Sequence, residues 1–181
     1  FSVGGFEDAV LGAMLESQGL TLDDVNLVNV NFALSPSLYA GKVDAVIGAF
    51  RNFELNQMDI DGRPGRAFYP EDHGVTAYEE LILVTHPDFA GKDKLERFLT
   101  VLDQATSLII NDPEASYRSF VSFRPDDLDN ELNRRAWRDT LPKLARKTRQ
   151  TDPNSWDQFA HFMKDRDLID SIPNQKTYLF P

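Results

Sequence analysis

The first half of the chain alternates between helical and strand-like apolar patterns. Apolar side chains from Val10 to Leu15 recur every three or four residues, which predicts an amphipathic helix. Two short apolar runs, VNLVNVNF at residues 25–32 and DAVIGAF at residues 44–50, are typical of strands buried in a parallel sheet. The segment SPSLYAG between them, residues 35–41, predicts a short helix. This alternation predicts right-handed parallel crossovers and an α/β layer.

The second half is helix-rich and contains one more strand pattern, ELILV at residues 80–84. Apolar residues at helical spacing from Leu95 to Ile109 predict a long helix, and the Asp-Pro pairs at 112–113 and 152–153 are typical helix starts. We therefore expect residues 92 to about 166 to be nearly all helical. A single strand cannot form a sheet, and the chain begins with Phe1 rather than Met, so we expect an N-terminal segment to be missing.

Composition and charge narrow the possible partners. The 181 residues are 41% hydrophobic and include 13 Phe, which is ample for a folded core. The net charge of −10 argues against nucleic acids and anionic membranes as partners. The chain has no Cys, which excludes thiol catalysis, disulfides and cysteine-bound metals within it. No apolar run is long enough to span a membrane, and no signal peptide is visible.

The sequence contains no recognisable catalytic or metal-binding motif. His73, His86 and His161 lie in unrelated segments without metal-ligand spacing, so we interpret them as surface histidines. The acids of DIDG suggest a calcium loop, but the residue at the position of its closing glutamate is Phe68. A nucleophile elbow and a phosphate-binding loop with lysine are also absent. We therefore predict no catalytic residue, no metal and no cofactor.

The segment DAVIGAFRNFELNQ is the strongest candidate for a ligand site. Its predicted strand ends at about Ala49 and is followed by Phe50, Asn52 and Glu54, and ligands of open α/β sheets bind at the carboxyl ends of strands. The turn before the first helix contains Gly4 and Gly5, which allow a close approach to helix N–H groups along the same edge. This combination suits a small polar heteroaromatic ligand.

A structural explanation of the same segment stays open at this point. Phe50 and Phe53 could belong to the hydrophobic core, and Glu54 could cap the helix that follows.

Three segments resemble the NMT1-type, ThiY-like substrate-binding proteins for thiamine pyrimidine precursors: FSVGGFEDAVLGAML, VNVNFALSPSLYAGKVDAVIGAFRNFELNQ and PEDHGVTAYEELILV. The resemblance covers residues 2–86 closely and extends to LNRRAWRDTLP. It implies a type II periplasmic-binding-protein-like fold, in which residues 1–76 form the second, middle α/β lobe with the ligand-facing loops. Residues 77–181 would then be the C-terminal helix-rich part of the first lobe.

The resemblance also implies a ligand and a set of binding residues. The ligand would be an aminopyrimidine such as formylaminopyrimidine, bound without catalysis. Glu54 would accept hydrogen bonds from the exocyclic amine and a protonated ring nitrogen, with Phe50 and Tyr78 as stacking surfaces and Asn52 as a hydrogen-bonding group. The expected ligand-binding residues are Ser2, Gly4, Gly5, Phe50, Asn52, Glu54 and Tyr78.

The expected partner of such a protein is the permease of an ABC transporter, in the periplasm or anchored outside the membrane. Because ELILV lacks neighbouring strands, we also expect the truncated chain to form a homodimer, to swap segments or to pack loosely unless the missing segment is supplied as a separate chain. Three alternatives share the fold: a thiamine pyrimidine synthase, a binding protein for riboflavin or a sulfonate, and the effector domain of a transcription regulator.

Overall fold

The computed structural model describes residues 5–148 and 151–179. The chain divides into two compact units, one formed by Phe1–Glu79 with Asp152–Thr177 and the other by Glu80–Thr151 with Tyr178–Pro181. The first unit therefore combines the beginning of the chain with residues 152–177. The prediction instead assigned all of residues 77–181 to one lobe. That lobe assignment stays a prediction.

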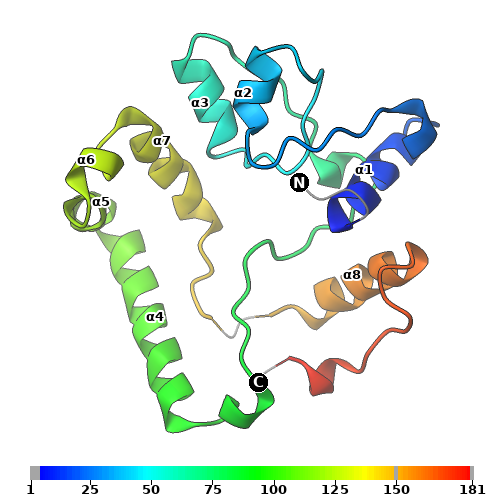
Figure 1. Ribbon diagram of the computed structural model, residues 1–181. Coiled ribbons are helices and arrows are strands. Elements are labelled where there is room, and N and C mark those ends of the chain that lie inside the picture. The colour runs from blue at the N-terminus through cyan, green and yellow to red at the C-terminus, as the bar shows by residue number, and fades with distance from the viewer. Residues whose placement is uncertain (1–4, 149–150, 180–181) are drawn as a thin grey trace. The chain divides into compact units, whose positions relative to one another are not determined.

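In the first unit, the helix that opens the chain packs against the last long helix (Figure 1). Its elements are α1 (Phe6–Glu16), η1 (Leu22–Asp24), α2 (Leu34–Tyr39), α3 (Glu54–Ile60), η2 (Pro70–Asp72), α8 (Pro153–Asp165) and η5 (Gln175–Thr177). Helix α1 forms where the apolar spacing predicts it, and α8 begins after Asp152, whose side chain accepts from the Asn154 N–H at 3.1 Å.

The core of the first unit lies between α1 and α8. Val10 and Ala13 of α1, Phe162 of α8 and Val75 from the connecting segment are buried together. Their burial removes apolar surface from water, which is the main favourable contribution to folding. Because α1 and α8 are far apart in the sequence, this core holds the beginning of the chain against a segment near its end.

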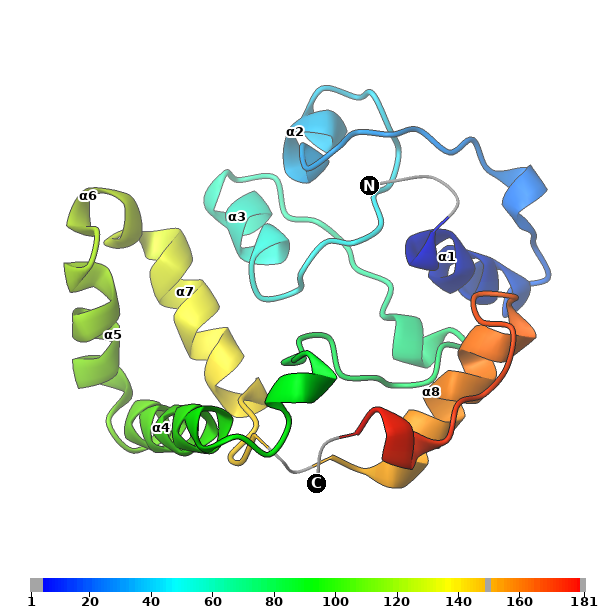
Figure 2. The same cartoon turned by 60° about the horizontal axis from the view of Figure 1, so that its bottom comes forward.

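The second unit is a set of helices joined by short turns (Figure 2). Its elements are η3 (Pro87–Phe89), α4 (Asp93–Asn111), α5 (Pro113–Ser122), α6 (Pro125–Leu128), α7 (Glu131–Thr140) and η4 (Leu141–Lys143). Helix α5 starts as predicted, with the Asp112 carboxylate accepting from the Ala115 N–H at 3.0 Å. The expectation that residues 92 to about 166 are nearly all helical is confirmed except at the short turns between helices and at residues 144–148 and 151–152, which are not helical.

Aromatic side chains form the centre of the second unit. Tyr117 is buried, and the Trp137 ring of α7 stacks on Phe120 of α5 with ring centroids 5.4 Å apart. The guanidinium carbon of Arg134, also in α7, lies 4.7 Å from the centroid of the Tyr117 ring. Helices α5 and α7 are therefore joined by contacts between aromatic rings.

The three apolar runs differ from the prediction, because no residue in 5–148 or 151–179 belongs to a β-strand. Segments 26–30 and 82–86 are irregular, and Gly48 interrupts the second run with a φ of +86°. Leu81 and Val84 are 87% and 85% exposed rather than buried in a sheet. The physical reason is that strands require hydrogen bonds between neighbouring segments, whereas these runs make local turns such as Ala33 N–H to Val30 C=O. The predicted parallel pairing is therefore not confirmed.

An ion pair joins the carboxyl-terminal ends of α1 and α8, and we expect it to make stability depend on pH. Arg166 donates to both oxygens of Glu16, at 3.4 and 2.8 Å. This hydrogen bond lowers the pKa of Glu16 below its ordinary value. A lowered carboxyl pKa stabilises the fold above the unfolded pKa, about 4.3, and this contribution is lost as the pH falls through the folded pKa.

The expected result is a melting-temperature difference between wild type and Glu16→Gln that is present at about pH 7 and disappears towards about pH 3. Thermal unfolding followed by circular dichroism across this range measures it. In an Arg166→Met background the same substitution should show no such pH dependence, and an unchanged dependence there would contradict the assignment to this pair.

Candidate functional site

The Phe50–Glu54 turn, defined by these five residues, contains three of the predicted ligand-binding residues and leads directly into α3. The Phe50 carbonyl accepts from the N–H groups of Phe53 and Glu54, each at 3.0 Å. The Glu54 carboxylate reaches back, and its Oε2 accepts from the Phe50 N–H at 2.6 Å. The carboxylate thus lies at the beginning of α3, where the helix dipole favours a negative charge.

These bonds bear on both interpretations of the segment. The local bond of Glu54 agrees with the capping alternative, but that bond uses one oxygen, and Oε1 accepts no hydrogen bond from any residue in the described ranges. The core alternative fails, because Phe50 and Phe53 are 47% and 37% exposed. Asn52 is half-buried, and its carbonyl accepts from Asn56 Nδ2 at 2.9 Å. The turn therefore presents an aromatic face beside a carboxylate.

Arg51 connects this turn to a second distinctive segment, PEDHGV. Its guanidinium binds Glu71 with both nitrogens, Nη1 to Oε1 at 2.8 Å and Nη2 to Oε2 at 2.9 Å. The guanidinium carbon also lies 4.0 Å from the centroid of the Tyr69 ring. The hydrogen bond to Glu71 raises the pKa of Arg51, so the guanidinium stays charged at any physiological pH.

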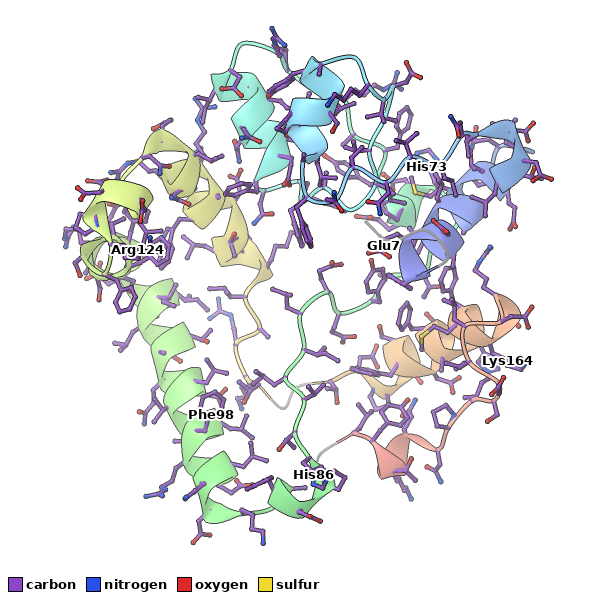
Figure 3. All side chains as sticks on the ribbon, in the orientation of Figure 1. Glu7, His73, His86, Phe98, Arg124 and Lys164 are labelled. Atoms are coloured by element: carbon purple, nitrogen blue, oxygen red, sulfur yellow. The ribbon has the colours of Figure 1, made fainter. Side chains whose placement is uncertain are left out.

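The Pro70–Val75 turn, which carries Glu71, is anchored in the core of the first unit. Val75 donates to the Pro70 carbonyl at 3.1 Å, and its side chain is buried with the core of α1 and α8. Gly74 has a φ of +85°, and a Cβ there would lie 3.4 Å from the Ala13 carbonyl of α1. Glycine therefore allows this turn to run close against α1. His73, labelled in Figure 3, belongs to the same turn.

The other predicted residues lie at the start of α1 and after the Pro70–Val75 turn. Gly5 is the N-cap of α1 with extended backbone, so the first N–H groups of the helix follow it directly. Ser2 and Gly4 lie outside the described residues. Tyr78 stacks on Phe159 of α8, with centroids 4.8 Å apart, and meets the edge of Phe6 at 5.3 Å. The structure thus gives Tyr78 a packing role between α1 and α8.

Sequence reasoning did not give a role in the site to Arg51, Tyr69, Glu71 or Phe159, and it did not predict that Arg51 contacts Glu71. Arg51 and Glu71 are separated by twenty positions in the sequence, and no periodicity or motif spacing marks them as a pair. The positions of Arg51 within GAFRNFELNQ and of Glu71 within PEDHGV were the available signals, because both segments carry the family resemblance.

A shallow surface hollow lies elsewhere in the first unit, between the start of α8 and the η5 turn. It is lined by Pro153, Asn154, Asp157 and residues 173–176, and it contains none of the predicted ligand-binding residues. The aromatic and carboxylate groups of the Phe50–Glu54 turn have the chemistry for a heteroaromatic ligand, so the turn, rather than the hollow, is the candidate site.

Residues 1–116 match the family described as NMT1/THI5 like, and the chain belongs to this family. The family has a periplasmic-binding-protein-like fold. The matched range spans both the Phe50–Glu54 turn and the Pro70–Val75 turn.

Several curated proteins are similar over almost the whole chain. A Haemophilus influenzae protein, named for an inferred role in thiamine biosynthesis, is 51% identical over 98% of this chain and 57% of its own length. The formylaminopyrimidine-binding protein of Halalkalibacterium halodurans is 23% identical over 90% of this chain and 52% of its own length. The 4-amino-5-hydroxymethyl-2-methylpyrimidine phosphate synthase of Schizosaccharomyces pombe is 23% identical over 95% of this chain and 53% of its own length.

The chain therefore spans about half the length of the curated relatives it matches. Among the residues that the structure describes, no helix has both the length and the apolar character needed to cross a membrane.

Proposed function

We propose that this chain belongs to a solute-binding protein that captures a thiamine-precursor aminopyrimidine, such as formylaminopyrimidine, without transforming it. The observation that carries the proposal is the 51% identity to the Haemophilus influenzae protein over 98% of the chain. The similarity to a formylaminopyrimidine-binding protein supports the ligand class.

The chemistry of the Phe50–Glu54 turn suits this ligand. An aminopyrimidine offers an exocyclic amine and a protonated ring nitrogen side by side, and a carboxylate accepts from both in charge-assisted hydrogen bonds. In the proposal Oε1 of Glu54 makes the first contact, while Phe50 provides a ring for stacking and Asn52 a polar contact. Ser2, Gly4, Gly5 and Tyr78 would complete the site.

The proposal extends to the architecture of the whole protein. The three apolar runs would become strands of two α/β lobes once they pair with neighbours, and residues 1–76 would form the middle lobe. Closure of the lobes would bury the ligand, as in other two-lobed binding proteins. The partner would be an ABC transporter permease, with the protein in the periplasm or anchored outside the membrane. Dimerisation through the exposed ELILV segment is part of the same proposal for the chain by itself.

A pyrimidine synthase is the second candidate function, and the Schizosaccharomyces pombe relative favours it. This chain contains no Cys, so any cysteine-dependent step of such an enzyme would need residues beyond this sequence. Conversion of substrate by the purified protein would support this candidate.

Isothermal titration calorimetry of the protein expressed from its complete gene tests the proposal. We expect saturable binding of formylaminopyrimidine and no heat from riboflavin or taurine, and we expect the ligand to be recovered unchanged. Tight binding of riboflavin or taurine without an aminopyrimidine signal would contradict the ligand class, and recovery of a converted product would favour the synthase.

A further inference from the structure

We propose that the Arg51–Glu71 ion pair is the positioning element of the binding site, which holds the Phe50–Glu54 turn against the Pro70–Val75 turn. This inference rests on the proposed function for its effect on ligand binding. Its structural part stands on contacts within the first unit alone.

Arg51 gives the Phe50–Glu54 turn an attachment to a distant segment. The bonds of Phe50 and Glu54 join residues four or fewer positions apart, so these bonds shape the turn itself. Arg51 projects from the middle of the turn and reaches twenty residues along the chain.

The other end of the ion pair is firmly placed. Glu71 lies in η2, and the same turn continues to Gly74, which runs close against α1, and to Val75 in the core. A continuous series of contacts therefore leads from the α1–α8 core through Glu71 and Arg51 to the predicted ligand-binding residues of the Phe50–Glu54 turn. Two parallel bonds and the Tyr69 ring restrict the guanidinium in direction as well as distance.

The exposure of the Arg51–Glu71 pair indicates that it affects ligand binding more than the stability of the fold. Both side chains are 44% exposed, and ion pairs with this access to water contribute little to the free energy of unfolding. A site, however, requires its groups to be held within about 0.5 Å of the productive geometry. Loss of the pair should therefore affect ligand affinity more than the melting temperature.

The test uses the protein expressed from its complete gene, with formylaminopyrimidine affinity measured by calorimetry. We expect Arg51→Met and Glu71→Gln each to weaken binding by roughly tenfold, and the double variant to be no weaker than either single variant. The reversed pair, R51E with E71R, should recover affinity to within about threefold of wild type, because the attachment is rebuilt with opposite charges.

Arg166→Met is the matched control, since Arg166 also binds a glutamate with two nitrogens in the first unit but joins α1 to α8 instead. The Arg166 guanidinium also lies over the ring of the core residue Phe162, 5.1 Å from its centroid, so we expect Arg166→Met to lower the melting temperature and leave affinity unchanged. If the reversed pair folds and does not recover affinity, Arg51 contacts the ligand itself and the positioning role is overturned.

Hydrogen exchange tests the attachment without any ligand. We expect amides of residues 50–56 to exchange faster in Arg51→Met than in wild type, and amides of α1 and α8 to be unaffected. Equal exchange in both proteins would overturn the inference whether or not the ligand binds. Absence of aminopyrimidine binding to wild type, with faster exchange in the variant, would refute the proposed function and retain the structural inference.

Discussion

Replacing Glu54 with glutamine is expected to weaken aminopyrimidine binding by roughly 2–4 kcal/mol. Glutamine keeps the size of the side chain, and its carbonyl can still accept the Phe50 N–H that closes the turn. The change therefore removes the charge and places an NH₂ group opposite the donors of the ligand. In a site closed from water, a ligand donor that loses its acceptor is costly, which is why the expected loss exceeds that of an ordinary hydrogen bond.

Calorimetry of wild type and Glu54→Gln, with circular dichroism to establish folding, measures this effect. Glu114→Gln is the matched control, because Glu114 also lies in the first turn of a helix, α5, but in the second unit. It should bind as wild type does. Unchanged affinity in a folded Glu54→Gln protein would remove Glu54 from the site.

Replacing Phe162 with alanine is expected to lower the free energy of unfolding of the first unit by about 3–5 kcal/mol. Phe162 is only 9% exposed and belongs to the core with Val10, Ala13 and Val75. Its ring is parallel to that of Phe159, with centroids 6.0 Å apart. Truncation loses the burial of the ring and leaves a cavity between α1 and α8, and the two costs add.

Urea denaturation followed by circular dichroism checks the expected loss. Phe32→Ala provides a control with the same chemical change, because Phe32 is 97% exposed and its removal should alter stability by no more than about 0.5 kcal/mol. A loss below about 1 kcal/mol for Phe162→Ala would mean that α1 and α8 do not share the core described.

The helices were predictable from the sequence because a helix is specified by neighbouring residues. The apolar spacing from Val10 to Leu15 and the Asp-Pro pairs before α5 and α8 each lie within the segment whose structure they indicate. The apolar runs were different. A run such as ELILV indicates a capacity for strand formation, and a strand exists only when another segment supplies its hydrogen bonds.

The candidate site divides in the same way. Phe50, Asn52 and Glu54 lie within five consecutive residues, so their proximity followed from the sequence, and the family resemblance gave them a ligand. The sequence left open whether Glu54 caps α3 or binds a ligand, because both roles require a carboxylate at this position. The structure shows that Glu54 accepts a hydrogen bond from the Phe50 N–H.

By itself, then, the sequence determined the helices and the family, because each depends on local pattern. Only the tertiary structure decided that Arg51 binds Glu71 and that Tyr78 stacks on Phe159 of α8. These contacts join positions 20 and 81 residues apart. The physical reason is that such pairs form when the burial of a shared core brings distant segments together, and no local pattern encodes which segments will meet.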